Sequence, residues 1–240
     1  MTYCVGLLLQ AGMVLLSDTR TNAGLDNIAT YRKMFTFETP GERVIVVMTA
    51  GSLSVTQTTI ARLRDTNDSP DATAENSILK APTMLKVAEI VGSTLATVRG
   101  EIQEKLSMGQ GASASMIVAG QRKGGGMRMF LIYPEGNFIE ATEDTPFLQI
   151  GEHKYGKPIL DRVVRPDTSL ADAQKAVLLS MDSTLRSNLS VGMPLDLCVI
   201  EKDALRVTSS RRIDAGDPDF REMSEAWSRA LREGFQQIVI

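Results

Sequence analysis

Three side chains near the start of the chain have the types and spacing needed for chemistry on an amide bond. Thr2 follows the initiator Met1, Asp18 ends an apolar run, and Lys33 follows a loop. Methionine aminopeptidases remove Met1 before small residues, so we expect the mature chain to begin at Thr2. The hydroxyl of an N-terminal threonine is a nucleophile. Its own α-amine, which titrates near ~7.7–8.0, can accept the hydroxyl proton.

Lysine and aspartate would assist such a nucleophile. A lysine beside the α-amine disfavours protonation of the amine and lowers the pKa of the hydroxyl, and an aspartate holds that lysine charged and in place. Each residue also has an ordinary explanation. Threonine after the initiator is common, an aspartate at a strand end is usually a turn residue, and a lone lysine is usually solvated. The spacing and the flanking strand pattern favour the joint interpretation.

Short apolar runs with turns between them predict the strands that would position these residues. The first two, TYCVGLLLQ and MVLLSD, are joined by a turn at Ala11-Gly12. Further strands are expected over residues 34–38, 43–50, 113–119, 127–133, 147–151, 195–200 and 205–209.

Apolar residues at three- and four-residue spacing predict the helices. The first helix is capped by Ser52 or Ser54 and leads into a polar surface loop over 65–81. The others are expected from Pro82 to the glycines at 109 and 111, from Pro158 to Val163, over 169–187, and from Pro218 after a capping Asp217.

The threonine, the aspartate sixteen residues on and the lysine fifteen further on resemble the proteasome β-subunit family of N-terminal nucleophile hydrolases. The segments SDTRTNAG, GEHKYGKPILDR and SVGMPLDL are similar to those of the bacterial ancestral β-subunit group, Anbu. The resemblance covers essentially the whole chain. It implies an α+β fold, a four-layer α/β/β/α sandwich, in a single domain over residues 1–240 with Met1 removed.

The resemblance also implies a function. Thr2, Asp18 and Lys33 would act as described, and the N–H of Gly51, at a strand-to-helix junction, would stabilise the oxyanion. Residues Thr19–Asn22 would pair with the substrate backbone as an added strand. The expected substrate is a peptide or unfolded protein, with no cofactor and no metal. The family implies a homo-oligomer, a ring or open spiral, and the sequence does not say whether an ATP-dependent unfoldase serves it.

Two departures from the family pattern leave alternatives open. Glu152 and His153 follow Gly151 where many members have Ser-Gly. Ser187 and Ser190 have the family spacing, but no aspartate occupies the first of these positions. The alternatives are a non-proteolytic hydrolase or transferase acting on a small amide, and a ring-forming scaffold with weak turnover or none.

Composition excludes several other classes. The chain has 240 residues, 43% hydrophobic and 23% charged, and its net charge of −3 gives no electrostatic argument for nucleic acid or an anionic membrane. We expect no signal peptide, no membrane span and a cytoplasmic location. Cys4 and Cys198 are expected to be buried reduced thiols. His153 is the only histidine, so a histidine-based metal site or Ser-His triad is poorly supported.

Overall fold

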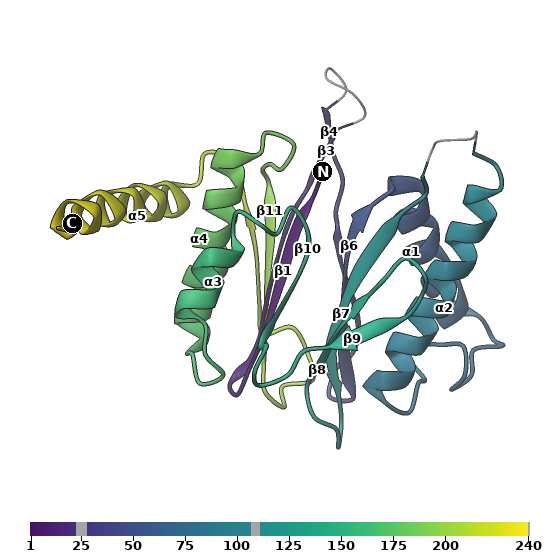
Figure 1. Ribbon diagram of the computed structural model, residues 1–240. Coiled ribbons are helices and arrows are strands. Elements are labelled where there is room, and N and C mark those ends of the chain that lie inside the picture. Colours follow the sequence, from purple (N-terminus) through teal and green to yellow (C-terminus); the bar gives the residue numbers. More distant parts are fainter. Residues whose placement is uncertain (23–27, 107–110, 240) are drawn as a thin grey trace.

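Two antiparallel sheets packed face to face, with helices covering both outer faces, form the fold (Figure 1). The computed structural model describes residues 1–22, 28–106 and 111–239. The sheets lie in the middle, α3 and α4 cover one, and α1 and α2 cover the other. The expected four-layer α/β/β/α sandwich is therefore confirmed.

The first sheet contains the strand that follows Thr2 and the strand that ends at Asp18. Its order is β10-β1-β2-β11-β12. Leu9 pairs with Gly12, so the predicted β1–β2 hairpin forms, but its turn is at Gln10-Ala11 rather than at the predicted Ala11-Gly12, because Gly12 already belongs to β2. The strands are β1 (Tyr3–Leu9), β2 (Gly12–Asp18), β10 (Phe147–Gly151), β11 (Leu195–Glu201) and β12 (Ser209–Ile213).

The second sheet runs in sequence order from β5 to β9, each strand antiparallel to the next. Its strands are β5 (Met34–Thr39), β6 (Arg43–Gly51), β7 (Ala114–Arg122), β8 (Arg128–Ile132) and β9 (Phe138–Glu140). A separate ribbon of β3 (Arg20–Asn22) and β4 (Ile28–Thr30) stands near the N-terminus at one end of the sandwich (Figure 1).

Most helices start where side-chain caps are available. Ser169 accepts a hydrogen bond from the Asp172 N–H, and Asp217 accepts one from the Phe220 N–H, as predicted for the last two helices. The last helix projects away from the sandwich (Figure 1). The helices are α1 (Leu53–Asp68), α2 (Met84–Gln103), α3 (Lys157–Val163), α4 (Leu170–Ser187) and α5 (Pro218–Gln237).

The inner strands are apolar on both faces because each sheet is buried on both sides. In β1, Tyr3, Val5 and Leu7 pack with the α3–α4 layer, whereas Cys4 packs in the layer between the sheets. Side chains alternate along an extended chain, so Thr2 belongs to the same side as Cys4. The alternation therefore directs Thr2 toward the space between the two sheets.

The strand predicted over 205–209 is wrong. Asp203 and Leu205 have φ values of 63° and 52°, which an extended strand does not allow. They form a turn, and β12 begins only at Ser209. The segment contains apolar residues that are typical of strands, so its sequence pattern did not predict this turn.

Helix boundaries also differ from the predictions. Ser52 is the N-cap of α1, but its side chain makes no capping hydrogen bond, and α1 continues to Asp68, into the predicted loop. Thr83 caps α2 by accepting from the Lys86 N–H, so α2 begins after Pro82 rather than at it.

The end of α2 also precedes the predicted glycine stop. The helix ends at Gln103, where the hydrogen bonds tighten: the Lys105 N–H donates to Ile102 and the Leu106 N–H donates to Gln103. Gly109, one of the two predicted stop residues, lies outside the described residues. None of the helices in the described part of the chain has both the length and the apolar character needed to cross a bilayer.

Candidate active site

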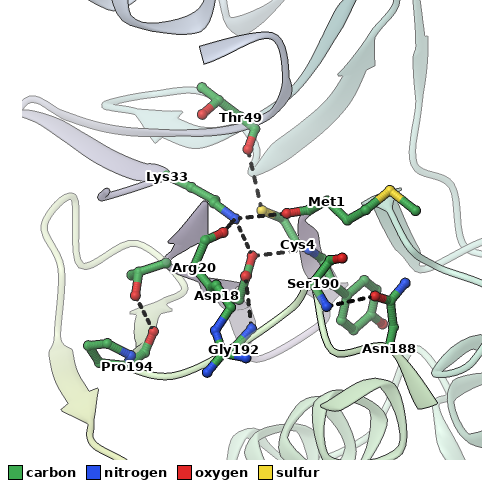
Figure 2. A network of polar contacts seen from close by, with 12 residues as sticks. Met1, Cys4, Asp18, Arg20, Lys33, Thr49, Asn188, Ser190, Gly192 and Pro194 are labelled. Carbon is green, nitrogen blue, oxygen red and sulfur yellow. Dashed lines mark hydrogen bonds and ion pairs between the residues drawn. The ribbon is translucent and has the colours of Figure 1, made fainter. Parts of the chain in front are cut away.

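A buried ion pair between Lys33 and Asp18 lies at the end of the sandwich where the chain begins (Figure 2). Lys33 Nζ is 2.8 Å from Asp18 Oδ1; Asp18 is fully buried and Lys33 is 5% exposed. Lys33 Nζ also donates to the carbonyl oxygens of Arg20, at 2.6 Å, and Met1, at 3.4 Å. These three acceptors match the three donors of an ammonium group.

Asp18, the last residue of β2, is held from both sides. The Tyr3 N–H donates to its Oδ1 at 3.1 Å and the Gly192 N–H donates to its Oδ2 at 3.2 Å. Burial raises the pKa of Asp18 above its ordinary value, while the Lys33 ammonium and the two N–H donors act in the opposite direction. Asp18 is thus a group whose ionisation depends on Lys33.

The raised pKa of Asp18 has a testable consequence for stability. The folded protein binds this proton more tightly than the unfolded chain, so the stabilisation is fully present below the unfolded pKa and is lost as the pH rises through the folded pKa. We expect the free energy of unfolding of the unmodified chain, relative to Asp18→Asn, to rise on acidification at pH values above 3.8. Urea unfolding at a series of pH values measures how this free-energy difference changes with pH. A difference that falls on acidification would contradict a raised pKa of Asp18 in the folded protein.

Thr2 is held beside this ion pair by its backbone. It is 8% exposed, and its carbonyl oxygen accepts a hydrogen bond from the Glu152 N–H at 2.7 Å. Gly151 has a φ of 81°, and a Cβ there would overlap the Thr2 carbonyl oxygen, so the close approach requires glycine. Lys33 Nζ contacts the carbonyl of Met1, which is bonded to the Thr2 nitrogen. The nitrogen that Met1 removal would free therefore lies next to the ammonium.

A pocket of about 430 Å³ opens over these residues. Thr2, Lys33 and Gly51 all line it, and Asp18 lies beneath, bonded to Lys33. The structure therefore places all four predicted residues at one site. The other lining residues are Met1, Thr21, Thr49, Ala50, Ser52, Leu53 and Thr56.

Gly51 ends β6 directly before the N-cap of α1, with a φ of 106°. A Cβ there would overlap the Ser113 carbonyl oxygen, whereas Gly41, with a φ of 77°, has no atom within 4 Å of its Cβ position. We expect Gly41→Ala to cost about 1–2 kcal/mol from backbone strain alone. We expect Gly51→Ala to cost more.

Displacement of Gly51 should also slow acylation of Thr2 about 10- to 100-fold if its N–H is the oxyanion donor that the sequence predicts, because that donor would move. Urea unfolding and the rate of Thr2 labelling by an electrophile measure the two effects. Equal effects of the two glycine substitutions on both measurements would contradict a special role for Gly51.

The two departures from the family pattern occupy defined positions. Glu152 contributes its backbone N–H to Thr2, and its carboxylate lies 3.8 Å from Lys154 Nζ. The Asn188 side chain accepts from the Ser190 N–H at 2.9 Å, so it stabilises its own turn (Figure 2). Among the described residues, neither side chain makes a hydrogen bond or ion pair with Thr2, so neither takes over the support that the serine and aspartate of the family pattern would give.

Sequence reasoning did not identify the turn that supports Asp18. Besides the Gly192 N–H, two side chains hold this turn. Arg20 donates to the Leu189 carbonyl at 2.9 Å, and Thr19 donates to the Pro194 carbonyl at 2.6 Å. A Cβ on Gly192 would overlap the Arg20 side chain. The only sequence signal was the glycine of SVGMP.

Metal chemistry has no visible ligand set in the described part of the chain. No group of three or more His, Cys, Asp or Glu side chains that could hold a metal ion occurs among those residues. Cys4 and Cys198 are free and buried, and burial raises the pKa of both thiols.

Sequence comparison identifies the family. A family model described as "Proteasome subunit" matches residues 2–200. The chain belongs to the proteasome subunit family. No curated protein matches it significantly.

Solved structures of Anbu proteins from this family are similar over the full chain. An Anbu (Gly-1) mutant from Hyphomicrobium sp. strain MC1 is 49% identical, with a TM-score of 0.94, covering 100% of this chain and 99% of the other. Anbu (ancestral beta-subunit) from Yersinia bercovieri is 42% identical, with a TM-score of 0.92 and coverages of 99% and 97%. A helical assembly of the Anbu complex from Pseudomonas aeruginosa is 45% identical, with a TM-score of 0.94 and coverages of 99% and 97%. The resemblance inferred from the sequence is confirmed.

Proposed function

We propose that the chain is a threonine-type N-terminal nucleophile hydrolase that cleaves peptide bonds through an acyl-enzyme on Thr2. The supporting observation is the position of Lys33 Nζ, 2.8 Å from Asp18 Oδ1 and 3.4 Å from the carbonyl bonded to the Thr2 nitrogen. A buried cation is thereby held next to a threonine that becomes N-terminal once Met1 is removed.

The proposed reaction has two steps. The Thr2 hydroxyl attacks the substrate carbonyl, and its α-amine takes the proton directly or through water. The Lys33 ammonium lowers the pKa of the hydroxyl, Asp18 holds Lys33, and the Gly51 N–H stabilises the oxyanion. The amine product leaves with a proton, and water then hydrolyses the Thr2 ester.

Intact mass of the purified protein tests this proposal. We expect a mass lacking Met1, and a single adduct after treatment with an epoxyketone or β-lactone that is absent from Thr2→Ala. Retention of Met1 would leave Thr2 without its base and would refute the mechanism. A processed chain that takes no adduct would favour the second candidate.

The second candidate is a ring-forming scaffold with little turnover. It is favoured by the contacts of Asn188. This side chain accepts a hydrogen bond within its own turn, and no aspartate of this turn supports the α-amine of Thr2. A further alternative is that Thr2 is active but acts on a small amide. Screening small amides alongside peptides as substrates distinguishes this alternative from peptide hydrolysis.

We also propose that the chain self-assembles, as a ring or open spiral, through α5. The helix projects from the sandwich (Figure 1) and exposes an apolar side at its end, where Leu231 is 54% and Phe235 is 78% exposed. The helical assembly of the similar Pseudomonas aeruginosa Anbu supports a second copy as the partner.

Charge placed on this apolar side should weaken assembly. We expect Leu231→Glu with Phe235→Glu to convert large assemblies into smaller species in light-scattering chromatography. Gln236→Glu, which adds charge at a neighbouring exposed position without removing apolar surface, is expected to assemble normally. Unchanged mass of the double variant would exclude α5 as the interface.

A further inference from the structure

A second cleft meets the Thr2 pocket at its edge. A pocket of about 440 Å³ shares Ala50 and Gly51 with the Thr2 pocket and reaches Gly151, which packs against the Thr2 carbonyl. It lies between the ends of β6, β7 and β8 of one sheet and β10 of the other. Thr2 therefore lines the first pocket and lies beside the end of the second.

The second cleft continues along β10. A further pocket of about 520 Å³ shares Leu131, Gln149 and His153 with it and extends to Lys157. The five residues of β10, Phe147–Gly151, all line one or both of these two pockets. The two pockets together are called the β10 cleft below.

β10 is an edge strand whose only sheet partner is β1 among the described strands. The Leu8 N–H donates to the Pro146 carbonyl and the Glu152 N–H donates to the Thr2 carbonyl. The backbone N–H and C=O groups of the even-numbered residues of β10 therefore point toward β1. Phe147, Gln149 and Gly151 consequently direct their backbone groups to the open side. The Gly151 carbonyl is used by His153, which leaves the backbone groups of Phe147 and Gln149 and the Gly151 N–H without a strand partner.

We propose that the β10 cleft binds the leaving-group side of a peptide substrate, which adds to the open edge of β10 as a short strand. An open edge is a template for an extended peptide. Five residues of strand span about 13 Å, enough for about three to four residues of substrate. The acyl side lies in the Thr2 pocket, so the bond that is cleaved is internal to a polypeptide rather than a small amide. This inference rests on the function proposed above.

The side chains of the cleft suit a peptide of mixed sequence. Near Thr2, polar side chains such as Ser115 and Tyr133 are mixed with apolar ones such as Ile150, and no Asp, Glu, Lys or Arg lines this part of the cleft. At the far end Lys157 is paired with Asp161 at 2.6 Å, and Asp144 is the one carboxylate of the lining outside this pair. The cleft therefore recognises backbone more than a particular charge.

His153 occupies the middle of the cleft. It lines both pockets, and its ring Nδ1 lies 3.1 Å from the Gly151 carbonyl oxygen, which fixes the ring near the strand end. A larger side chain at this position would obstruct the passage. The next residue, Lys154, has a side chain that is 66% exposed and lines neither pocket, so it provides a matched control.

Aminolysis of the acyl-enzyme tests the cleft directly. Thr2 is acylated with a small activated ester, and glycinamide or peptide amides of two to five residues are then offered. The amine nitrogen attacks the ester carbonyl, the Thr2 oxygen leaves and takes up the proton, and an amide forms. Mass spectrometry gives the ratio of amide to hydrolysed acid.

We expect this ratio at equal amine concentration to rise at least 10-fold from glycinamide to a tripeptide amide and to level off beyond about four residues. His153→Trp should remove the dependence on length, and Lys154→Trp should retain it. Equal ratios for glycinamide and the tripeptide amide would overturn the cleft alone. Failure of Thr2 to acylate at all would overturn the proposed function and the cleft with it.

Discussion

Replacing Lys33 by methionine is expected to abolish Thr2-dependent hydrolysis and to lower the free energy of unfolding by about 3–5 kcal/mol at pH 7. Lys33 is the only side-chain cation bonded to Asp18 among the described residues, and both side chains are buried. Its loss leaves a buried carboxylate that only two backbone N–H groups stabilise. The loss of hydrolysis follows because the α-amine and hydroxyl of Thr2 lose the neighbouring charge.

A double variant separates the two effects. Lys33→Met with Asp18→Asn carries no buried charge, so it should recover most of the stability and none of the activity. Acidification should also reduce the penalty of Lys33→Met alone, because Asp18 can then take up a proton. Urea unfolding and the rate of Thr2 labelling measure both effects. A Lys33→Met protein as stable as the double variant at pH 7 would show that Asp18 does not depend on Lys33.

Replacing Thr2 by alanine is expected to reduce peptide hydrolysis by about 10³-fold or more, because no acyl-enzyme can form. Thr2 is nearly buried, but its contacts with Glu152 use backbone atoms. The substitution should therefore change the free energy of unfolding by no more than about 1 kcal/mol.

Thr2→Ser provides the matched control, since it keeps the hydroxyl and the amine. It should retain the electrophile adduct and measurable turnover of a fluorogenic peptide. If Thr2→Ala hydrolysed that peptide at the unmodified rate, another nucleophile would have to be responsible, and the assignment of Thr2 would be abandoned.

Local sequence patterns predicted the elements whose signals lie within one segment. The β1–β2 hairpin follows from two apolar runs and a short turn, and α4 follows from Ser169 and Asp172 at its start. The strand expected at 205–209 failed because the positive φ values of Asp203 and Leu205 depend on the turn geometry rather than on residue type. The start of α2 also differed from the prediction, because the hydrogen bond from the Lys86 N–H to the Thr83 side chain sets the first turn of this helix.

The residue types, spacing and apolar patterns of the sequence by themselves determined the candidates Thr2, Asp18 and Lys33 and the longer strands and helices, but not the short strands β3, β4 and β9. Only the tertiary structure decided how they are held together. Asp18 depends on the N–H of Gly192, which is 174 residues away in the chain. The open edge of β10 depends on which strands pair, and that is settled by packing of the two sheets. Such contacts join distant segments through backbone groups that every residue carries. The residue types in the sequence therefore do not predict them.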